Sequence, residues 1–318
     1  MTLTLNERAK RLADQLMTEA AGLRIDVSRS ATGARLIDCG IQAEGGLRAG
    51  LSLARICMAD LAEVTILPGE IAGVTCPHVQ VLTDFPVLAC MASQYAGWQI
   101  SVGKFFAMGS GPMRAAYGKE DLFDKIPGRE QPSLAVGVME SKKLPTEEVI
   151  QFLSDKLKMP PDRLALFVAP ASSQAGTIQV VARSLETALH KLYEMKFDLN
   201  QVVSGVGTAP LPPVAVDEIQ AIGWTNDAIL YGGRVTLWVR GDDEQIREIG
   251  PRVPSSASAD HGEPFAAIFK RYHNDFYKID PMLFSPAEIV FRNLKTGRTQ
   301  AFGTVSLEIL QSSFFAGS

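Results

Sequence analysis

The spacing of hydrophobic and polar positions changes between two periods along the chain, which predicts that strands and helices alternate. Apolar or alternating runs bounded by turn residues predict strands at 34–41, 63–67, 78–84, 133–141 and 163–170. Apolar residues three and four positions apart predict helices near 6–23, 46–61, 144–159 and 176–191, the first with Asn6 as its N-cap. We therefore expect the α/β class with a mixed α+β character.

The last third of the chain continues this mixture. The pattern predicts a helix at 215–223, a strand at 234–241, a helix at 262–272 and a hairpin at 287–310. Two polar stretches, "TNDAILYGG" (225–233) and "SSASADHGEP" (255–264), are predicted to be loops. Such loops either supply turns and caps or line sites for polar ligands, and the pattern leaves both interpretations open.

The domain organisation follows from length and from one polar interval. A chain of 318 residues is typical of about two domains or lobes. The proline-containing interval 119–132 is the best candidate for a linker or an excursion. We therefore expect a first lobe at 1–128 and a second at 129–318, with interleaving of the two left open.

Composition and charge exclude several classes of protein. The chain is 46% hydrophobic and 21% charged with a net charge of −4, and it has no block of consecutive basic residues. These values indicate a globular protein that does not bind nucleic acid. Charged residues at 7–11 occupy the place of a signal-peptide core, and the apolar runs are too short to span a bilayer. We expect a cytoplasmic protein without a membrane partner.

Four cysteines, Cys39, Cys57, Cys76 and Cys90, are widely spaced and form no CxxC pair. This distribution predicts reduced, mostly buried thiols. The fragment Cys76-Pro77-His78, with Cys90 further on, does not have the spacing of a zinc ribbon or finger, so we expect no metal site.

Two glycine-rich motifs are incomplete as nucleotide fingerprints. In Gly109-Ser110-Gly111-Pro112 a third glycine is replaced by Arg114, no GK[ST] follows, and Gly205-Val206-Gly207 is incomplete in the same way. A nucleotide site is therefore disfavoured. A tight structural turn and a loop that presents backbone N–H groups to a substrate both remain open.

Aromatic residues gather in the stretch "DFYKIDPMLFSP" (275–286), where two prolines restrain the backbone. Phe276 and Phe284 are explained either by core packing or by an aromatic wall for a planar ring system. Composition does not choose between these two interpretations.

The predicted helix "GTIQVVARSLETALHK" (176–191) has two stripes. The first is apolar and consists of Ile178, Val181, Ala182, Leu185, Leu189 and Leu192. The second is polar and consists of Gln179, Arg183, Glu186 and His190. Arg183 and Glu186 are three positions apart, so they form either a surface ion pair or part of a ligand crevice after the preceding buried strand.

Nine segments in the same order resemble one family, methenyltetrahydromethanopterin cyclohydrolase. They are "DCG", "DLAEV", "SQYAGWQI", "KFFAMGSGP", "APASSQAGTIQVVARSLETALHK", "VSGVGTAPLPP", "TNDAILYGG", "PSSASADHGEPFAAIFK" and "DFYKIDPMLFSPAEI". The resemblance extends from about residue 5 to 310.

The resemblance implies a cofactor-independent, metal-free hydrolase of one-carbon metabolism. Such an enzyme interconverts the methenyl and 5-formyl forms of tetrahydromethanopterin or of its dephosphorylated bacterial analogue. The family's fold implies two α/β lobes with the substrate in a cleft between them, assembled as a homotrimer. The modest charge content favours a bacterial formaldehyde-oxidising host over a salt-adapted methanogen.

The family's catalytic glutamate and its partner arginine correspond to Glu186 and Arg183, and both are intact. The chemistry suits these side chains, because one carboxylate near its pKa can take a proton from water and later give it to a ring nitrogen. By resemblance, the substrate contacts are expected at Ser93, Gln94, Lys104, Ser110, Gly111, Asn226 and Phe284.

Two rival functions fit the sequence less well. A non-catalytic pterin-binding or carrier protein would have no use for the acid–base pair Arg183 and Glu186. A nucleotide-dependent α/β enzyme would require the phosphate fingerprints that the glycine motifs do not complete.

Overall fold

A computed structural model describes residues 4–315, which form two compact units. The described part of unit 1 comprises residues 4–62 and 87–179, and that of unit 2 comprises residues 63–86 and 180–315. The segment 129–179 thus groups with the N-terminal residues, whereas the sequence predicted it in the second lobe. The interval 119–132 lies inside unit 1, where Glu130 accepts hydrogen bonds from the backbone nitrogens of Leu5 (2.8 Å) and Asn6 (2.9 Å).

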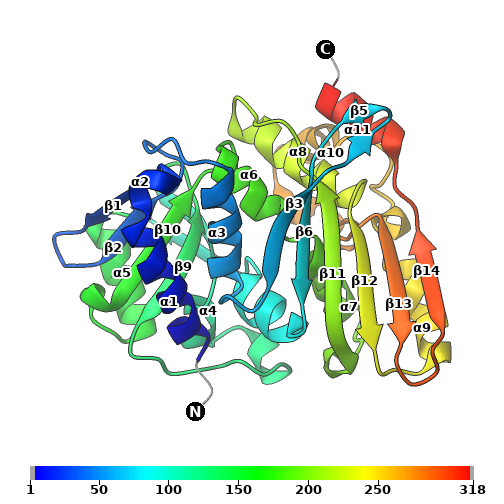
Figure 1. The fold of residues 1–318 in the computed structure, drawn as a ribbon, viewed down its shortest axis with the longest axis horizontal. Coiled ribbons are helices and arrows are strands. Elements are labelled where there is room, and N and C mark those ends of the chain that lie inside the picture. Colours follow the sequence, from blue (N-terminus) through cyan, green and yellow to red (C-terminus); the bar gives the residue numbers. More distant parts are fainter. Residues whose placement is uncertain (1–3, 316–318) are drawn as a thin grey trace. The chain divides into compact units, whose positions relative to one another are not determined.

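Unit 1 is built on a six-stranded mixed sheet (Figure 1). Its strands, in spatial order, are β1 (Asp26–Arg29), β2 (Arg35–Asp38), β10 (Leu164–Ala169), β9 (Ala135–Glu140), β8 (Phe105–Ser110) and β7 (Trp98–Val102). The central strands β2, β10 and β9 run parallel, and the remaining pairs are antiparallel. A parallel centre is typical of a sheet that helices cover on both faces.

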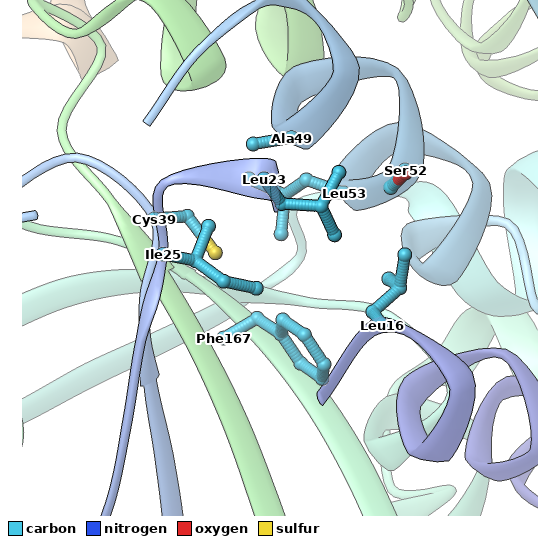
Figure 2. Close-up of a pocket in the computed structure, with 8 residues that line it drawn as sticks. All are labelled: Leu16, Leu23, Ile25, Cys39, Ala49, Ser52, Leu53 and Phe167. Atoms are coloured by element: carbon cyan, nitrogen blue, oxygen red, sulfur yellow. The ribbon is translucent and has the colours of Figure 1, made fainter. Parts of the chain in front are cut away.

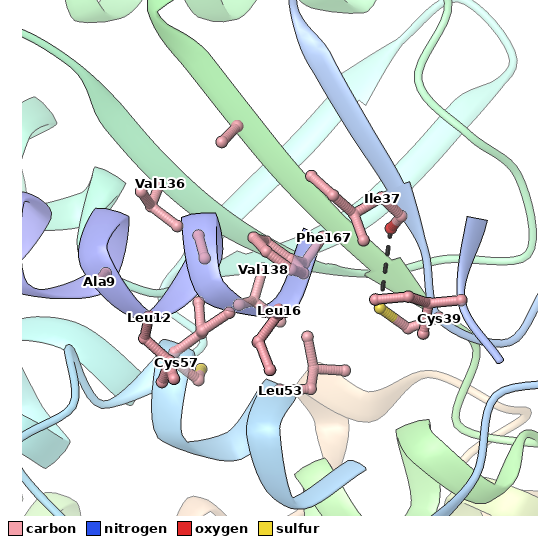
Figure 3. Close-up of a cluster of buried hydrophobic side chains, with 14 of the residues drawn as sticks. Ala9, Leu12, Leu16, Ile37, Cys39, Leu53, Cys57, Val136, Val138 and Phe167 are labelled. Atoms are coloured by element: carbon pink, nitrogen blue, oxygen red, sulfur yellow. Dashed lines mark hydrogen bonds between the residues drawn. The ribbon is translucent and has the colours of Figure 1, made fainter. Parts of the chain in front are cut away.

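The alternation of strand β10 shows this double coverage. Its odd-numbered residues pack with α1 (Leu5–Thr18) and α3 (Leu47–Cys57) in one hydrophobic core. Its even-numbered residues pack with α5 (Glu147–Leu157) in a second core. Figure 3 shows the first core around Phe167. The continuous apolar run that predicted a buried strand is confirmed, because successive side chains enter different cores.

The other helices of unit 1 are short, and one of them, α6, continues into unit 2. They are α2 (Ala20–Leu23), the π-helix η1 (Val87–Gln94), α4 (Met113–Tyr117), α6 (Gln174–Val181) and the 3₁₀ turns Asp121–Asp124 and Pro161–Arg163.

The prediction that Asn6 is the N-cap of the first helix is wrong. Thr4 is the N-cap, and it forms a capping box in which the backbone nitrogen of Glu7 donates to Thr4 Oγ1 over 3.2 Å. Asn6 is buried instead, since its Nδ2 donates to the Pro112 carbonyl (2.8 Å) and its Oδ1 accepts from the Val136 nitrogen (2.8 Å). Its polar side chain therefore connects α1 to the sheet and to the segment before α4.

Unit 2 contains a second six-stranded sheet and a small hairpin (Figure 1). The strands of the sheet, in spatial order, are β14 (Thr299–Gly303), β13 (Glu288–Asn293), β12 (Arg234–Val239), β11 (Val202–Pro210), β6 (His78–Thr83) and β3 (Glu63–Leu67). Only the pair β12 and β13 is parallel among these neighbours. The hairpin consists of β4 (Glu70–Ile71) and β5 (Val74–Thr75). The hairpin predicted at 287–310 is confirmed over 288–303 as β13 and β14, whereas residues 307–310 belong to a helix and not to the second strand.

Along the sequence, the helices of unit 2 lie between its strands or after the last strand. They are α7 (Ser184–Glu194), α8 (Glu218–Leu230), α9 (Asp243–Ile249), α10 (Phe265–Arg271), α11 (Leu307–Phe315) and the 3₁₀ turns Leu199–Gln201, Gly250–Arg252, Ser255–Ala257, Phe276–Lys278 and Pro281–Leu283. Within residues 4–315, no helix has both the length and the apolar character needed to cross a membrane.

The stretch 225–233, predicted to be a loop, is mostly the second half of α8. Two of its polar side chains form hydrogen bonds with the backbone of the same helix. Thr225 Oγ1 donates to the Ala221 carbonyl (2.7 Å), and Asn226 Nδ2 donates to the Ile222 carbonyl (2.8 Å). These contacts satisfy side chains that otherwise compete with helical backbone bonds.

Candidate functional site

The region predicted as one helix at 176–191 is two helices. Helix α6 ends at Val181, and α7 begins at Ser184, with Arg183 as its N-cap residue at φ −88° and ψ 3°. The Arg183 nitrogen donates to the Val180 carbonyl (3.0 Å), and the Thr187 nitrogen donates to the Arg183 carbonyl (2.9 Å). The break places Glu186 in the first turn of a new helix, where backbone N–H groups and the helix dipole favour a negative charge.

The polar stripe of this region is buried. Gln179, Arg183 and Glu186 are 3%, 8% and 4% exposed, so a solvated surface ion pair does not account for them. His190 is half-buried, and its Nε2 lies 3.8 Å from Oε1 of Glu194. A buried carboxyl and a buried guanidinium at a helix start are expensive to desolvate, which is typical of groups kept for a specific task.

Strand β11 lets the first turn of α7 come unusually close. A β-carbon on Gly207 would lie 2.6 Å from Ser184 Oγ and 2.9 Å from the Leu185 nitrogen. A β-carbon on Gly205 would lie 2.7 Å from Leu185 Cδ1. The Gly-Val-Gly motif therefore serves close packing between helix and sheet, which positions the turn that carries Glu186.

The expected contacts Ser93 and Gln94 end the π-helix η1. All but one of its residues are buried, and the Tyr95 nitrogen donates to the Cys90 carbonyl (2.7 Å) in the five-residue spacing of a π-turn. Such turns are rare and frequently mark functional sites. The apolar, small-residue sequence of this stretch gave no indication of that geometry.

Cys57 is the centre of a polar cluster in unit 1. Its Sγ lies 3.2 Å from Ser110 Oγ, 3.6 Å from the donating Gln179 Nε2 and 3.9 Å from the Gln94 carbonyl oxygen. Its own carbonyl accepts a hydrogen bond from Ser93 Oγ (2.6 Å). The structure thus brings Ser93, Gln94 and Ser110 together around a thiol that was predicted only to be buried and reduced.

The glycine loop after β8 is tied to this cluster. Gly111 has φ +85°, which favours glycine, and its nitrogen donates to the Ser93 carbonyl (2.8 Å). Ser110 Oγ also donates to the Val138 carbonyl (3.2 Å). Gly111 therefore holds the end of the π-helix, and Ser110 connects Cys57 to β9.

Arg114, considered in the sequence only because it replaces a glycine of the nucleotide fingerprint, also holds the end of the π-helix in place. It is fully buried, and its Nη1 donates to the carbonyls of Met91 (2.9 Å) and Ser93 (3.4 Å). Its Nε donates to Glu120 Oε1 (2.9 Å), and its guanidinium lies 4.8 Å from the centre of the Tyr95 ring. An arginine inside a run of small and apolar residues was the signal that could have identified it.

Lys104 is not part of this cluster. It is exposed in the turn between β7 and β8, at the opposite end of β8 from Ser110. Ser110 lies six positions further along an extended strand, which is about 20 Å along the sheet. Lys104 therefore does not join Ser110 in one local site.

Asn226 is half-buried on α8, and its neighbour Asp227 is fully buried. Asp227 accepts hydrogen bonds from the Phe265 nitrogen (2.7 Å) and from Ser313 Oγ (2.6 Å). Burial raises the pKa of Asp227 to about 7 despite these two donors. The sequence did not identify Asp227 as a candidate residue, because the stretch 225–233 was predicted to be a loop.

Phe284 belongs to an aromatic group in unit 2. Its ring is stacked on Phe276 with centroids 4.5 Å apart and an interplanar angle of 20°, and Phe265 lies 5.8 Å from it. Phe276 is 40% exposed, whereas Phe265 is buried. The group thus packs in the core through Phe265 and is accessible at Phe276, while its role as a wall for a planar ring stays a prediction.

Lys191 is a further buried charge on α7. Its Nζ donates to the Met282 carbonyl, and burial lowers the pKa of its ammonium to about 8. No spacing rule distinguishes this lysine from the solvated lysines of an amphipathic helix, because its partner is 91 positions away.

All four cysteines are buried and none forms a disulfide, as predicted. Cys76 Sγ lies 3.4 Å from the Leu211 carbonyl oxygen, and burial raises the pKa of its thiol to about 11. The ring Nδ1 of His78 lies 3.0 Å from the Cys76 carbonyl oxygen. The Cys-Pro-His fragment is therefore accounted for by its contact with Leu211 and by the contact between His78 and Cys76.

A small apolar space lies inside the first core of unit 1 (Figure 2). It is lined by Leu16, Leu23, Ile25, Cys39, Ala49, Ser52, Leu53 and Phe167. The space is too narrow to admit a water molecule, and its lining has almost no polar surface, so it is a packing defect of the core.

Comparison with known proteins identifies relatives over nearly the whole chain. The sequence model of the family described as Cyclohydrolase (MCH) matches residues 4–314. Methenyltetrahydromethanopterin cyclohydrolase of Rhodopirellula baltica is 47% identical over 315 residues, 98% of this chain and 94% of its own. The proteins of the same name from Methylobacillus flagellatus and Methanosarcina barkeri are 43% and 41% identical, over 98% of this chain and 95% and 98% of their own.

Proposed function

The chain belongs to the cyclohydrolase family MCH, and from this membership we propose that it hydrolyses a methenyl-tetrahydromethanopterin reversibly to the 5-formyl form. The observation that supports the proposal most directly is the burial of Glu186 and Arg183 at the start of α7 in a chain that matches the family over residues 4–314. The substrate is the methenyl derivative of tetrahydromethanopterin or of a close analogue.

In the proposed reaction Glu186 moves the protons. The methenyl carbon belongs to an amidinium-like cation, so it is electrophilic without a metal or an organic cofactor. A water oxygen forms a bond to this carbon while one water proton passes to the Glu186 carboxylate. The Glu186 carboxyl then protonates the amidinium nitrogen other than N5. The bond between this nitrogen and the former methenyl carbon breaks, and both electrons of that bond stay on the nitrogen. The hydroxyl loses its remaining proton as the formyl C=O forms, and one proton is released overall.

Arg183 has the complementary role in this proposal. Burial disfavours the charged form of a carboxyl, whereas a neighbouring guanidinium and a helix N-terminus favour it. Opposing influences of this kind keep an acid–base group able to exchange protons at working pH. Arg183 directly precedes α7, and Glu186 lies in its first turn, so both influences are available at this position.

The rest of the predicted site remains part of the proposal. Ser93, Gln94, Ser110 and Gly111, which are clustered in unit 1, and Asn226 and Phe284 of unit 2 are each proposed as substrate contacts. Lys104, exposed on its hairpin, is proposed only as a contact for the flexible acidic tail of the substrate. The homotrimer and the cleft between lobes also remain predictions from the resemblance.

A direct assay tests the function. Purified protein is added to the methenyl substrate in the presence of a chelator and without nucleotide, and loss of the methenyl chromophore is followed together with proton release. We expect enzyme-dependent loss of the chromophore with one proton released per turnover. Binding of the substrate without turnover would instead identify a carrier protein. A requirement for ATP would identify a nucleotide-dependent enzyme.

A further inference from the structure

The side chain of Lys191 is only 1% exposed, although it carries an ammonium group. Lys191 lies on α7, five positions after Glu186. A buried charge is unfavourable unless hydrogen bonds compensate for its lost hydration. The hydrogen bond from Nζ to the Met282 carbonyl provides such compensation and joins α7 to the segment 280–285. The energetic cost of this arrangement requires an explanation beyond helix formation.

The segment 280–285 is otherwise organised by Asp280. The Asp280 carboxylate accepts hydrogen bonds from the Met282 nitrogen (2.9 Å) and from Ser258 Oγ (2.6 Å). The Asp280 nitrogen donates to Asp260 Oδ2 (3.0 Å). These bonds close the turn and attach its beginning to the 255–264 loop. Lys191 supplies the attachment to α7.

The same segment carries Phe284, two residues after the carbonyl that Lys191 binds. Phe284 stacks on Phe276, which is 40% exposed. Stacked aromatic side chains with one accessible member suit a flat ring system. The position of this surface depends on where the 280–285 backbone is held.

We propose that Lys191 is a positioning residue that fastens the 280–285 segment to α7 and thereby sets Phe284 against a planar ring of the substrate. This inference rests on the proposed function, because it takes the substrate to contain a pterin ring. It adds to that function a physical connection between the helix that carries Glu186 and the aromatic surface.

The attachment itself is tested without substrate. Backbone hydrogen–deuterium exchange of the peptide covering 279–287 is compared in the wild type, Lys191→Met and Lys196→Met. Lys196 is an exposed lysine just after α7 and serves as the matched control. We expect exchange of this peptide to rise at least tenfold in Lys191→Met and to be unchanged in Lys196→Met. Unchanged exchange in Lys191→Met would overturn the attachment.

The role in binding is tested by a double-mutant cycle between Lys191→Met and Phe284→Leu, with KM and kcat measured for each variant. If Lys191 acts by placing Phe284, each single change raises KM about tenfold, kcat stays within threefold, and the double variant is no worse than either single one. Lys191→Arg, which keeps the charge and the donor, is expected to restore most of the KM. The same cycle with Lys196→Met should show independent effects.

Two outcomes would overturn the inference. One is that Lys191→Met and Phe284→Leu raise KM independently, so that their effects multiply in the double variant. The other is that Lys191→Met lowers kcat and leaves KM unchanged, which is the result of a smaller amount of folded enzyme. If Lys191→Met does not fold, Lys191→Gln replaces it in both experiments. Absence of turnover by the wild type would refute the proposed function instead, while the exchange experiment would still decide whether Lys191 holds the segment.

Discussion

Gly207 leaves space for Ser184: a β-carbon on Gly207 would lie 2.6 Å from Ser184 Oγ and 2.9 Å from the Leu185 nitrogen. Real β-carbons do not approach other atoms so closely, and one of the two contacts is with backbone that cannot rotate away. The first turn of α7, which carries Glu186, therefore has the position that it has because β11 has no side chain there.

We expect Gly207→Ala to shift this turn and to reduce kcat at least tenfold. Overpacking of this kind lowers the free energy of unfolding by about 1–3 kcal/mol. The measurements are steady-state kinetics and chemical denaturation of the purified variant. Gly22→Ala is the control, because the β-carbon that it adds meets nothing within 4 Å beyond its chain neighbours and the backbone of its own helix. A Gly207→Ala enzyme with kcat within twofold of the wild type would contradict the argument.

Glu186→Gln is expected to fold normally and to lose most of its turnover. The amide has nearly the same shape as the carboxyl but cannot carry the proton, and loss of a general acid–base group typically costs about 10²–10⁴ in rate. The matched control is Glu194→Gln, an exposed position on the same helix, which should keep full activity. Thermal unfolding of both variants checks the fold. Near-normal hydrolysis by Glu186→Gln would refute its assignment as the proton carrier.

Asp227 makes stability depend on pH in a defined direction. Burial raises the pKa of Asp227 from 3.8 to about 7, so the folded state binds its proton more tightly than the unfolded state. The resulting stabilisation is fully present below pH 3.8 and is lost as the pH rises through 7. Relative to Asp227→Asn, the free energy of unfolding of the wild type should therefore fall by on the order of 2 kcal/mol between pH 5 and 8.

Denaturant unfolding at the two pH values measures this difference. Asp155→Asn, which changes an exposed aspartate on α5, is the control and should show no such pH-dependent difference. A difference between wild type and Asp227→Asn that is constant or increases toward pH 8 would show that Asp227 is charged in the folded protein across this range.

Much of the fold could be predicted because it depends on local periodicity. The continuous apolar run 164–169 indicated a strand buried on both faces, and β10 enters two cores. The alternation of 78–83 indicated a half-buried strand, which β6 is. The hairpin predicted at 287–310 requires a turn between its strands, and Gly297, between β13 and β14, has the positive φ (73°) of such a turn. These features are properties of short segments, so the sequence contains them directly.

The candidate site was predictable only in part. The apolar stripe of 178–192 and the adjacent Arg183 and Glu186 could be read from spacing and from the family resemblance. The sequence has no glycine or proline to indicate the break between α6 and α7, since neither Ala182 nor Arg183 is a helix breaker. The break accompanies close packing of α7 on β11, which is a contact between distant segments.

By itself, the sequence determined the alternation of strands and helices, the buried character of β10 and the presence of a carboxyl and a guanidinium three positions apart. Only the tertiary structure decided that Asn6 is a buried connector, that 225–230 is helical, that Cys57 gathers Ser93 and Ser110, and that Lys191 reaches Met282. The physical reason is that burial and hydrogen-bond partners of polar side chains depend on segments far apart in the chain, whereas periodicity reports only which face of an element is apolar.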